Sequence, residues 1–113
     1  MAFGEILETH FHFDSARVVV SLDSDFMFSH PQYLRYIRDF ANGRRVSDEA
    51  KEMNRLYVVE STPTITGTAA DHRLPMASSE IEGFARQLRL AVLGQAPADG
   101  TKGNNASWIH AIA

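Results

Sequence analysis

The sequence predicts an α/β fold in which a short, mainly parallel sheet is flanked by helices. Two runs rich in β-branched residues, 16–22 (ARVVVSL) and 56–59 (LYVV), are typical of buried strands. A helical pattern separates them, and a strand-helix-strand unit of this kind is expected to be parallel and right-handed. A second helical stripe follows over 79–94. The order strand, helix, strand, helix therefore sets the predicted architecture.

Length and composition limit the classes of protein that this chain can be. Its 113 residues, 44% hydrophobic and 22% charged, suit one domain with one core. Without cysteine, the chain alone cannot build a disulfide, a thiolate-held zinc site or an iron–sulfur cluster. No apolar run approaches the roughly 20 residues that span a bilayer, and no signal pattern opens the chain. A formal net charge of -3 argues against nucleic acid as a partner. We therefore expect a soluble chain without direct membrane insertion.

The first 15 residues are expected to form a mixed lead-in to the first strand. His10 and His12 would share one face of an extended segment, which is a spacing that suits a metal ion, but the sequence shows no third ligand. Solvent-facing histidines beside buried Phe11 and Phe13 are the favoured interpretation, so no metal ligand is predicted.

The first strand is expected to end at an acidic turn, Asp23-Ser24-Asp25, whose short side chains bond nearby backbone. Ser29 or His30 is expected to cap the following helix, with Pro31 in its first turn. The predicted apolar face of this helix and its left-handed C-cap comprise Leu34, Ile37, Phe40, Ala41 and Gly43.

A charged connection over 44–52, with Ser47 as the cap of a helical turn, leads to the second strand. That strand stops at Glu60, and Pro63 requires a turn because it has no amide hydrogen for a sheet ladder. A loop therefore leaves the carboxyl end of a central strand, which is the edge where open α/β sheets bind ligands. A short extended piece over 69–75 follows.

The next predicted element is a helix opened by Ser79, which forms a capping box with Glu82. Segment 96–106 is expected to be a flexible loop. Ser107 then resembles the N-cap of a helix that stops after two turns or fewer, so we expect a single domain over 1–113 that is an excerpt of a longer chain. The stripe of the main helix comprises Ile81, Phe84, Ala85, Leu88, Ala91 and Val92, and ends near Gly94.

Two segments resemble the cofactor-holding turns of the molybdopterin oxidoreductase family. Segment 21–31 (SLDSDFMFSHP) is similar to a strand-end turn in which Gly-x-Asn-Pro is often followed by Ser/Thr-His-Pro. Segment 58–75 (VVESTPTITGTAADHRLP) is similar to Asp-Pro-Arg-x-Thr-x-Thr-Ala-x-x-Ala-Asp-x-x-Leu-Pro. Within the family, three segments are most similar to the iron–sulfur, molybdopterin-oxidoreductase-like subunit of alternative complex III, a quinol:electron-acceptor oxidoreductase. These segments are LDSDF, YVVESTPTITG and ADHRLPMASSEI.

The resemblance implies a Rossmann-like three-layer fragment that holds one guanosine-phosphate arm of a molybdopterin guanine dinucleotide cofactor at its strand ends. Iron–sulfur clusters would lie elsewhere in the parent chain. The parent would be exported and membrane-associated on the periplasmic side. Its remaining domains, and the other subunits of a membrane-bound respiratory complex, would be the partners of this domain.

By position, the resemblance also implies which residues would bind the cofactor. Asp25 takes the place of the turn asparagine, and Glu60 takes the place of a ribose-facing aspartate. Glu80 matches a guanine-facing aspartate only if one residue is missing before Ser79. The full candidate set comprises Ser24, Asp25, Glu60, Thr64, Thr66, Asp71 and Glu80.

Departures from the family pattern indicate that this arm of the cofactor is not bound. Asp23 replaces the glycine that lets a phosphate approach the backbone, and Thr62 replaces an arginine. With Asp25, Asp23 puts two carboxylates where a pyrophosphate would approach. At an effective dielectric constant near 20, each like-charge contact at about 4 Å costs on the order of 4 kcal/mol. Subunits of alternative complex III are thought to have lost the molybdenum cofactor, so the resemblance implies a non-catalytic scaffold domain in an electron-transfer complex.

Two alternatives stay open. The first is a functional molybdopterin guanine dinucleotide-binding domain of a molybdenum oxidoreductase. The second is a free-standing Rossmann-like interaction module that pairs between copies through Trp108 and Ile109. No serine or threonine stands in a recognisable arrangement with a base, so no catalytic residue is predicted for this domain alone.

Overall fold

A computed structural model describes residues 4, 6–47, 52–95 and 104–113. These residues form three strands and four helices, which alternate along the chain up to the last two helices. In order they are β1 (Val18–Leu22), α1 (Tyr33–Asn42), β2 (Arg55–Glu60), α2 (Ile65–Thr68), β3 (His72–Pro75), α3 (Ser78–Val92) and α4 (Asn104–Ile112). The predicted α/β class is confirmed.

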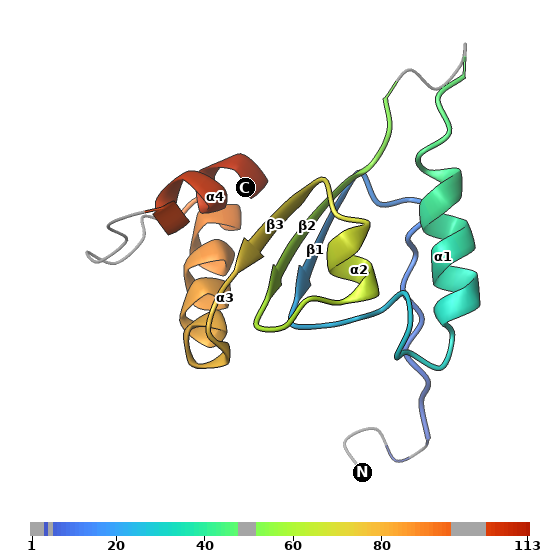
Figure 1. The fold of residues 1–113 in the computed structure, drawn as a ribbon, viewed down its shortest axis with the longest axis horizontal. Helices are drawn as coiled ribbons and strands as arrows, with labels where there is room; N and C mark the ends of the chain where they lie inside the picture. The colour runs from blue at the N-terminus through green and yellow to red at the C-terminus, as the bar shows by residue number, and fades with distance from the viewer. Residues whose placement is uncertain (1–3, 5, 48–51, 96–103) are drawn as a thin grey trace.

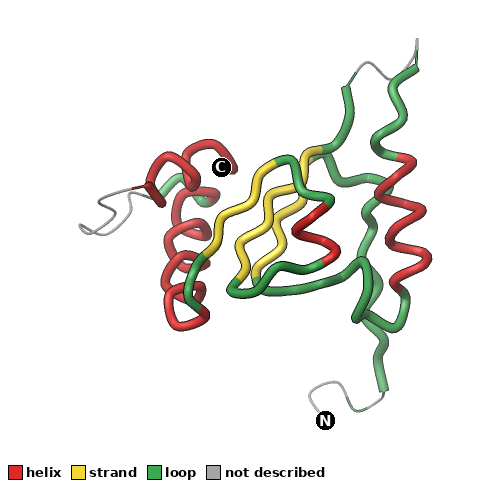
Figure 2. Tube along the Cα trace, in the orientation of Figure 1, coloured by secondary structure: helices red, strands yellow, loops and turns green. Residues whose placement is uncertain are grey.

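The strands form one parallel sheet in the order β1-β2-β3, so β2 is central and β1 and β3 are its edges. Val20 of β1 lies opposite Tyr57, and Val59 of β2 lies opposite Leu74. Helices α1 and α2 cover one face of the sheet, whereas α3 and α4 cover the other (Figure 1). The same three layers are visible when the chain is coloured by secondary structure (Figure 2). The predicted Rossmann-like three-layer fragment is therefore what the chain forms.

Each face of the sheet has its own hydrophobic cluster, because successive side chains of a strand point to opposite faces. Leu56 and Val58 of β2 pack toward α1, while Val59 packs toward α3. With both faces covered, β2 is buried along most of its length, as the apolar run LYVV predicts. The α1 cluster comprises Phe13, Val19, Phe26, Met27, Tyr36, Phe40, Leu56 and Val58. The α3 cluster comprises Val59, Met76, Ile81, Phe84, Leu88 and Ile109.

The face of α1 that packs on the sheet differs in part from the predicted one. Phe40 is buried as predicted, whereas Leu34 is 68% exposed and Ile37 is 38% exposed. Tyr36, which was not predicted to face the sheet, is buried instead. The lead-in explains the difference, because its backbone bonds the Tyr36 hydroxyl: the Phe11 amide donates to that oxygen at 3.3 Å. A tyrosine with its hydroxyl satisfied in this way packs as a core aromatic residue.

The predicted ends of α1 are also wrong. Its N-cap position is Gln32, without a side-chain hydrogen bond, so Ser29, His30 and Pro31 lie in a turn ahead of the helix. Ser29 instead donates its hydroxyl to the Asp25 carbonyl at 2.9 Å.

At the other end of α1, Gly43 has a φ of -67° and is not a left-handed cap. A Cβ at this position would fall 2.6 Å from Nδ2 of Asn54, so close approach accounts for the glycine.

Helix α3 confirms the predicted stripe at Ile81, Phe84 and Leu88, although Val92 is exposed. The capping box is wrong, because the N-cap position is Ala77 and Ser79 lies inside the helix. Gly94 has a φ of +67° just beyond the helix, where glycine tolerates the left-handed conformation.

Helix α2 was not predicted, because four residues carry too little periodicity to be recognised. The extended piece expected over 69–75 is shorter in the structure, where β3 covers only 72–75. Helix α4 begins at Asn104 rather than at Ser107. The rest of the predicted loop before it, and most of the connection after Ser47, lie outside the described residues. No described helix is long and apolar enough to cross a membrane.

Candidate functional site

The carboxyl edge of the sheet, where the family resemblance places the cofactor-holding turns, begins with an aspartate in a glycine-like conformation. Asp23 directly follows β1 and has a φ of +50°, which is a left-handed backbone that non-glycine residues rarely adopt. Its amide donates to the Val59 carbonyl at 2.8 Å, which extends the β1-β2 ladder by one bond. The turn therefore keeps the shape that a glycine would give it, but carries a carboxylate.

The carboxylate of Asp23 binds the loop that follows β2. Its Oδ1 accepts the Ser61 amide at 2.9 Å and the Ser61 hydroxyl at 3.0 Å. These bonds, the backbone one first, lower the pKa of Asp23. Asp23 is thus an ionised side chain that joins the ends of β1 and β2.

A second bridge runs from Asp25 to α2. Oδ1 of Asp25 accepts the Thr66 amide at 3.0 Å and the Thr66 hydroxyl at 2.6 Å. The same hydroxyl oxygen accepts the Met27 amide at 3.1 Å, and Thr66 is completely buried. Thr66 therefore uses its hydroxyl as both donor and acceptor, which fixes the turn after β1 against α2.

The third carboxylate, Glu60, is 1% exposed at the end of β2. Thr64 donates its hydroxyl to Oε2 at 2.6 Å, and Nε of Arg73 donates to Oε1 at 2.5 Å. Burial opposes ionisation, but the bonds from Thr64 and Arg73 outweigh it and lower the pKa of Glu60. Glu60 is therefore a buried, paired carboxylate.

The first turn of α2 packs directly on Glu60. Thr64 is the N-cap of α2, because its Oγ1 accepts the Gly67 amide at 3.0 Å while donating to Glu60. A Cβ at Gly67 would fall 2.5 Å from Cδ of Glu60 and overlap its oxygens. Only glycine leaves room for the carboxylate at this point.

The other predicted residues do not join this cluster. Asp71 precedes β3 and so lies at the opposite, amino edge, where Arg44 donates to its two oxygens at 2.9 and 2.6 Å. The Leu56 amide also donates to it, at 2.8 Å. The bonds from Arg44, opposed by partial burial, lower the pKa of Asp71. Ser24 is exposed, as is Glu80 in the first turn of α3.

The structure thus brings together Asp25, Glu60, Thr64 and Thr66, and places Asp71 elsewhere. It also adds three residues that sequence reasoning did not select: Ser61, Gly67 and Arg73. The spacing Thr-x-Thr-Gly at 64–67 was a usable signal for the close approach of a helix to the strand end. No local pattern pairs Arg73 with Glu60, because 13 residues separate them.

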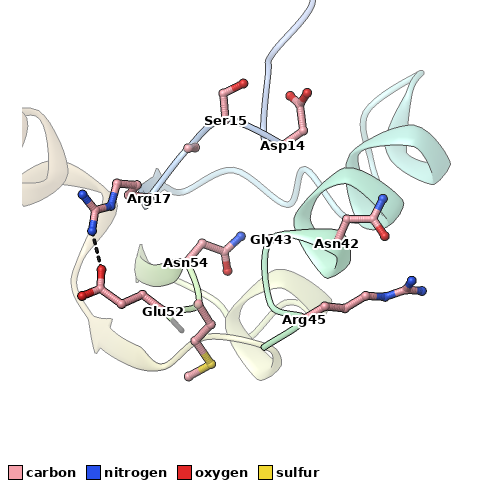
Figure 3. A pocket seen from close by; sticks show the side chains of 10 residues that line it. Asp14, Ser15, Arg17, Asn42, Gly43, Arg45, Glu52 and Asn54 are labelled. Carbon is pink, nitrogen blue, oxygen red and sulfur yellow. Dashed lines mark hydrogen bonds and ion pairs between the residues drawn. The ribbon is translucent and has the colours of Figure 1, made fainter. Parts of the chain in front are cut away.

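A cavity of about 690 Å³ lies at the amino edge of the sheet, away from this cluster (Figure 3). Arg17 and Glu52 form an ion pair at its wall, and Asp14 and Arg45 also line it. Asn54 is held by the Phe40 carbonyl, to which its Nδ2 donates at 3.1 Å. The mixed charges of the lining give a ligand no single sign to match.

The two histidines of the lead-in lie beside carboxylates. Nε2 of His10 is 4.0 Å from Glu8, and Nδ1 of His12 is 3.8 Å from Asp14. Phe13 is buried as expected, but Phe11 is 49% exposed. Within the described ranges, no three histidine, aspartate or glutamate side chains form a group that could hold a metal ion.

Compared with models of protein families and with curated proteins, the chain matches none. The resemblance to molybdopterin oxidoreductases therefore stays a prediction, and the geometry of the carboxyl edge has to be judged by its own chemistry.

That geometry does not fit the phosphates of a guanine dinucleotide. Asp23, Asp25 and Glu60 bring three carboxylates to the strand ends, and the guanidinium beside them, Arg73, is engaged by Glu60. An approaching phosphate would meet like charges whose hydrogen-bonding capacity is directed to protein donors. The arrangement is suited to holding strands, turn and helix in register.

Proposed function

We propose that this chain is a non-catalytic scaffold domain of a molybdopterin-oxidoreductase-like subunit in a quinol-oxidising respiratory complex. In this role the domain binds no cofactor and transfers no electrons itself. Its partners are the remaining domains of the parent chain and the other subunits of the complex, on the periplasmic side of the membrane.

One observation carries the proposal: the carboxylates at the ligand edge are hydrogen-bonded to the protein's own groups. Asp23 binds Ser61, Asp25 binds Thr66, and Glu60 binds Thr64 and Arg73. A site built to hold a dinucleotide needs backbone amides and cations facing outward, because those groups stabilise phosphate oxygens. Here the Ser61 and Thr66 amides are used by aspartates instead.

The family resemblance supplies the larger setting. In the family this layer holds one guanosine-phosphate arm of the cofactor, and a layer that no longer binds that arm still fills its place in the parent chain. The paired aspartates support such a structural role, since each joins two segments that are far apart in sequence: 38 residues separate Asp23 from Ser61, and 41 separate Asp25 from Thr66.

The proposal is tested on the native protein that contains this chain. We expect heat extraction of the purified protein to release no guanine nucleotide, and elemental analysis to find no molybdenum in stoichiometric amount. A molar equivalent of guanine nucleotide or molybdenum would instead identify a working cofactor-binding domain. Absence of iron, together with purification as a lone polypeptide, would contradict the respiratory setting.

A further inference from the structure

One edge of the sheet is open to another strand. Within the described part of the chain, β1 pairs only with β2, so its second edge carries no partner. Val18, in the first position of the strand, is 47% exposed. The strand VVVSL contains no charged residue and no proline, which are two of the features by which natural edge strands avoid pairing.

The pattern of the β1-β2 ladder shows which backbone groups face this edge. The Arg17 carbonyl accepts the Arg55 amide at 2.9 Å, and the Asp23 amide donates to Val59 at 2.8 Å, so odd-numbered residues face β2. Because strand groups alternate in direction, the amides and carbonyls of Val18, Val20 and Leu22 face outward. Three amide donors and three carbonyl acceptors of β1 therefore line this edge and can pair with a second strand.

An apolar depression of about 270 Å³ lies along the same strand. Phe11, Phe13 and Phe26 line it beside Val20 and Leu22. Phe11 is half-exposed, so an apolar side chain arriving with a second strand would cover aromatic surface. Backbone pairing and side-chain burial would thus occur together, as in the addition of a strand to a sheet edge.

We propose that β1 pairs antiparallel with β1 of a second copy of this chain, across a twofold axis at Val20. In this register Val20 lies opposite Val20 of the other copy, and Val18 lies opposite Leu22. All three outward-facing residues then form hydrogen-bonded pairs, and two three-stranded sheets become one sheet of six strands.

Charge complementarity favours this occupant and this register. The residues that flank β1 are Arg17, whose side chain is 84% exposed, and Asp23, which is exposed at the strand end. Antiparallel pairing about Val20 places Arg17 of each copy opposite Asp23 of the other, so each guanidinium, which pairs with Glu52 in its own chain, gains a second carboxylate. Opposite charges in directly facing positions stabilise a strand pair, whereas like charges destabilise it. The inference does not depend on the proposed function.

Sedimentation equilibrium of the full chain tests the pairing over a range from about 1 μM to about 1 mM. We expect a concentration-dependent dimer. In the variant Arg17→Glu, a glutamate of each copy faces Asp23 of the other, so like charges meet at two places in the dimer. This change should weaken the dimer at least about tenfold, since placing like charges side by side is strongly unfavourable. Arg38→Glu, an equal change of charge on the exposed surface of α1, is the control and should leave the dimer intact.

A mixing experiment separates the register from a general effect of charge. Asp23→Arg alone should weaken the dimer in the same way as Arg17→Glu. An equimolar mixture of the two variants restores opposite charges at both facing positions and should form a heterodimer. Val18→Lys, at an exposed position, provides a second way to block the edge if Asp23→Arg does not fold. A monomeric parent chain at every concentration would overturn the proposal, as would a dimer that Arg17→Glu and Val18→Lys leave unchanged.

Discussion

Replacing Thr66 with valine removes one hydroxyl from the centre of the carboxyl edge while keeping the shape of the side chain. Thr66 is completely buried, so water cannot take over its bonds. The change leaves the Asp25 carboxylate without its 2.6 Å donor and the Met27 amide without its 3.1 Å acceptor. The Thr66 amide still donates to Asp25 at 3.0 Å, so the turn loses part of its support rather than all of it.

The expected cost follows from these two losses. A hydrogen bond to a charged group contributes about 1.5 to 3 kcal/mol, and a buried donor left unpaired costs about 1 to 3 kcal/mol. Relaxation of the turn will offset part of the sum, so we expect Thr66→Val to lower the free energy of unfolding by about 3 kcal/mol.

Urea denaturation followed by circular dichroism measures this difference directly. Thr68→Val is the matched control, because Thr68 is exposed and its hydroxyl donates only to the Thr64 carbonyl, at 2.9 Å. We expect this control to change the free energy of unfolding by less than about 0.5 kcal/mol. A Thr66→Val variant as stable as the parent chain would refute the view that the edge carboxylates and hydroxyls hold the fold.

Further variants probe the other bridges. Gly67→Ala should destabilise the fold by about 2 kcal/mol or more in the same urea assay, because the added methyl group overlaps the Glu60 carboxylate. The control is Gly83→Ala in α3, whose methyl group would enter open space. This control should stabilise the fold by about 0.5 to 1 kcal/mol. The pKa values of Glu60 and Asp71 are lowered on folding, so stability should be fully present above the unfolded pKa near 4 and fall as the pH drops through the folded values. Urea titrations from pH 7 to pH 3 check this, and stability that rises toward low pH would contradict it. Asp71→Asn should lower the free energy of unfolding by about 1 to 3 kcal/mol at pH 7, since it breaks the paired hydrogen bonds from Arg44. It should also make the free energy of unfolding depend less on pH. An unchanged pH dependence would show that folding does not alter the titration of Asp71.

The strands were predictable from local sequence because burial on both faces of a sheet leaves a continuous apolar run. The buried face of helix α1 was harder to predict. Phe40 is buried as predicted, but Leu34 and Ile37, which share its stripe, are exposed. Tyr36 also has helical spacing from Phe40, and the lead-in, by bonding the Tyr36 hydroxyl, decides that Tyr36 is the buried partner. Periodicity describes one element, whereas the choice of face depends on what packs against it.

At the candidate site, the family resemblance named Asp25, Glu60, Thr64 and Thr66, and the structure places all four at one edge. The sequence did not show that these side chains are hydrogen-bonded within the protein, because most of their donors come from distant segments. Asp71 was assigned by resemblance, but it precedes β3 by one residue and so lies at the amino edge, where the sequence alone gave no sign of its pairing with Arg44.

Whether the carboxyl edge binds nucleotide is tested most directly by titrating this chain with GDP and following its amide chemical shifts. We expect no saturable change at residues 23–26 or 60–67, because the edge carboxylates repel phosphate and the nearby amides are already bonded. In the variant Asp23→Gly/Thr62→Arg, which removes a carboxylate and adds a guanidinium, any residual binding should strengthen. Saturable shifts of the 23–26 amides in the unaltered chain would contradict the account and identify a working nucleotide holder.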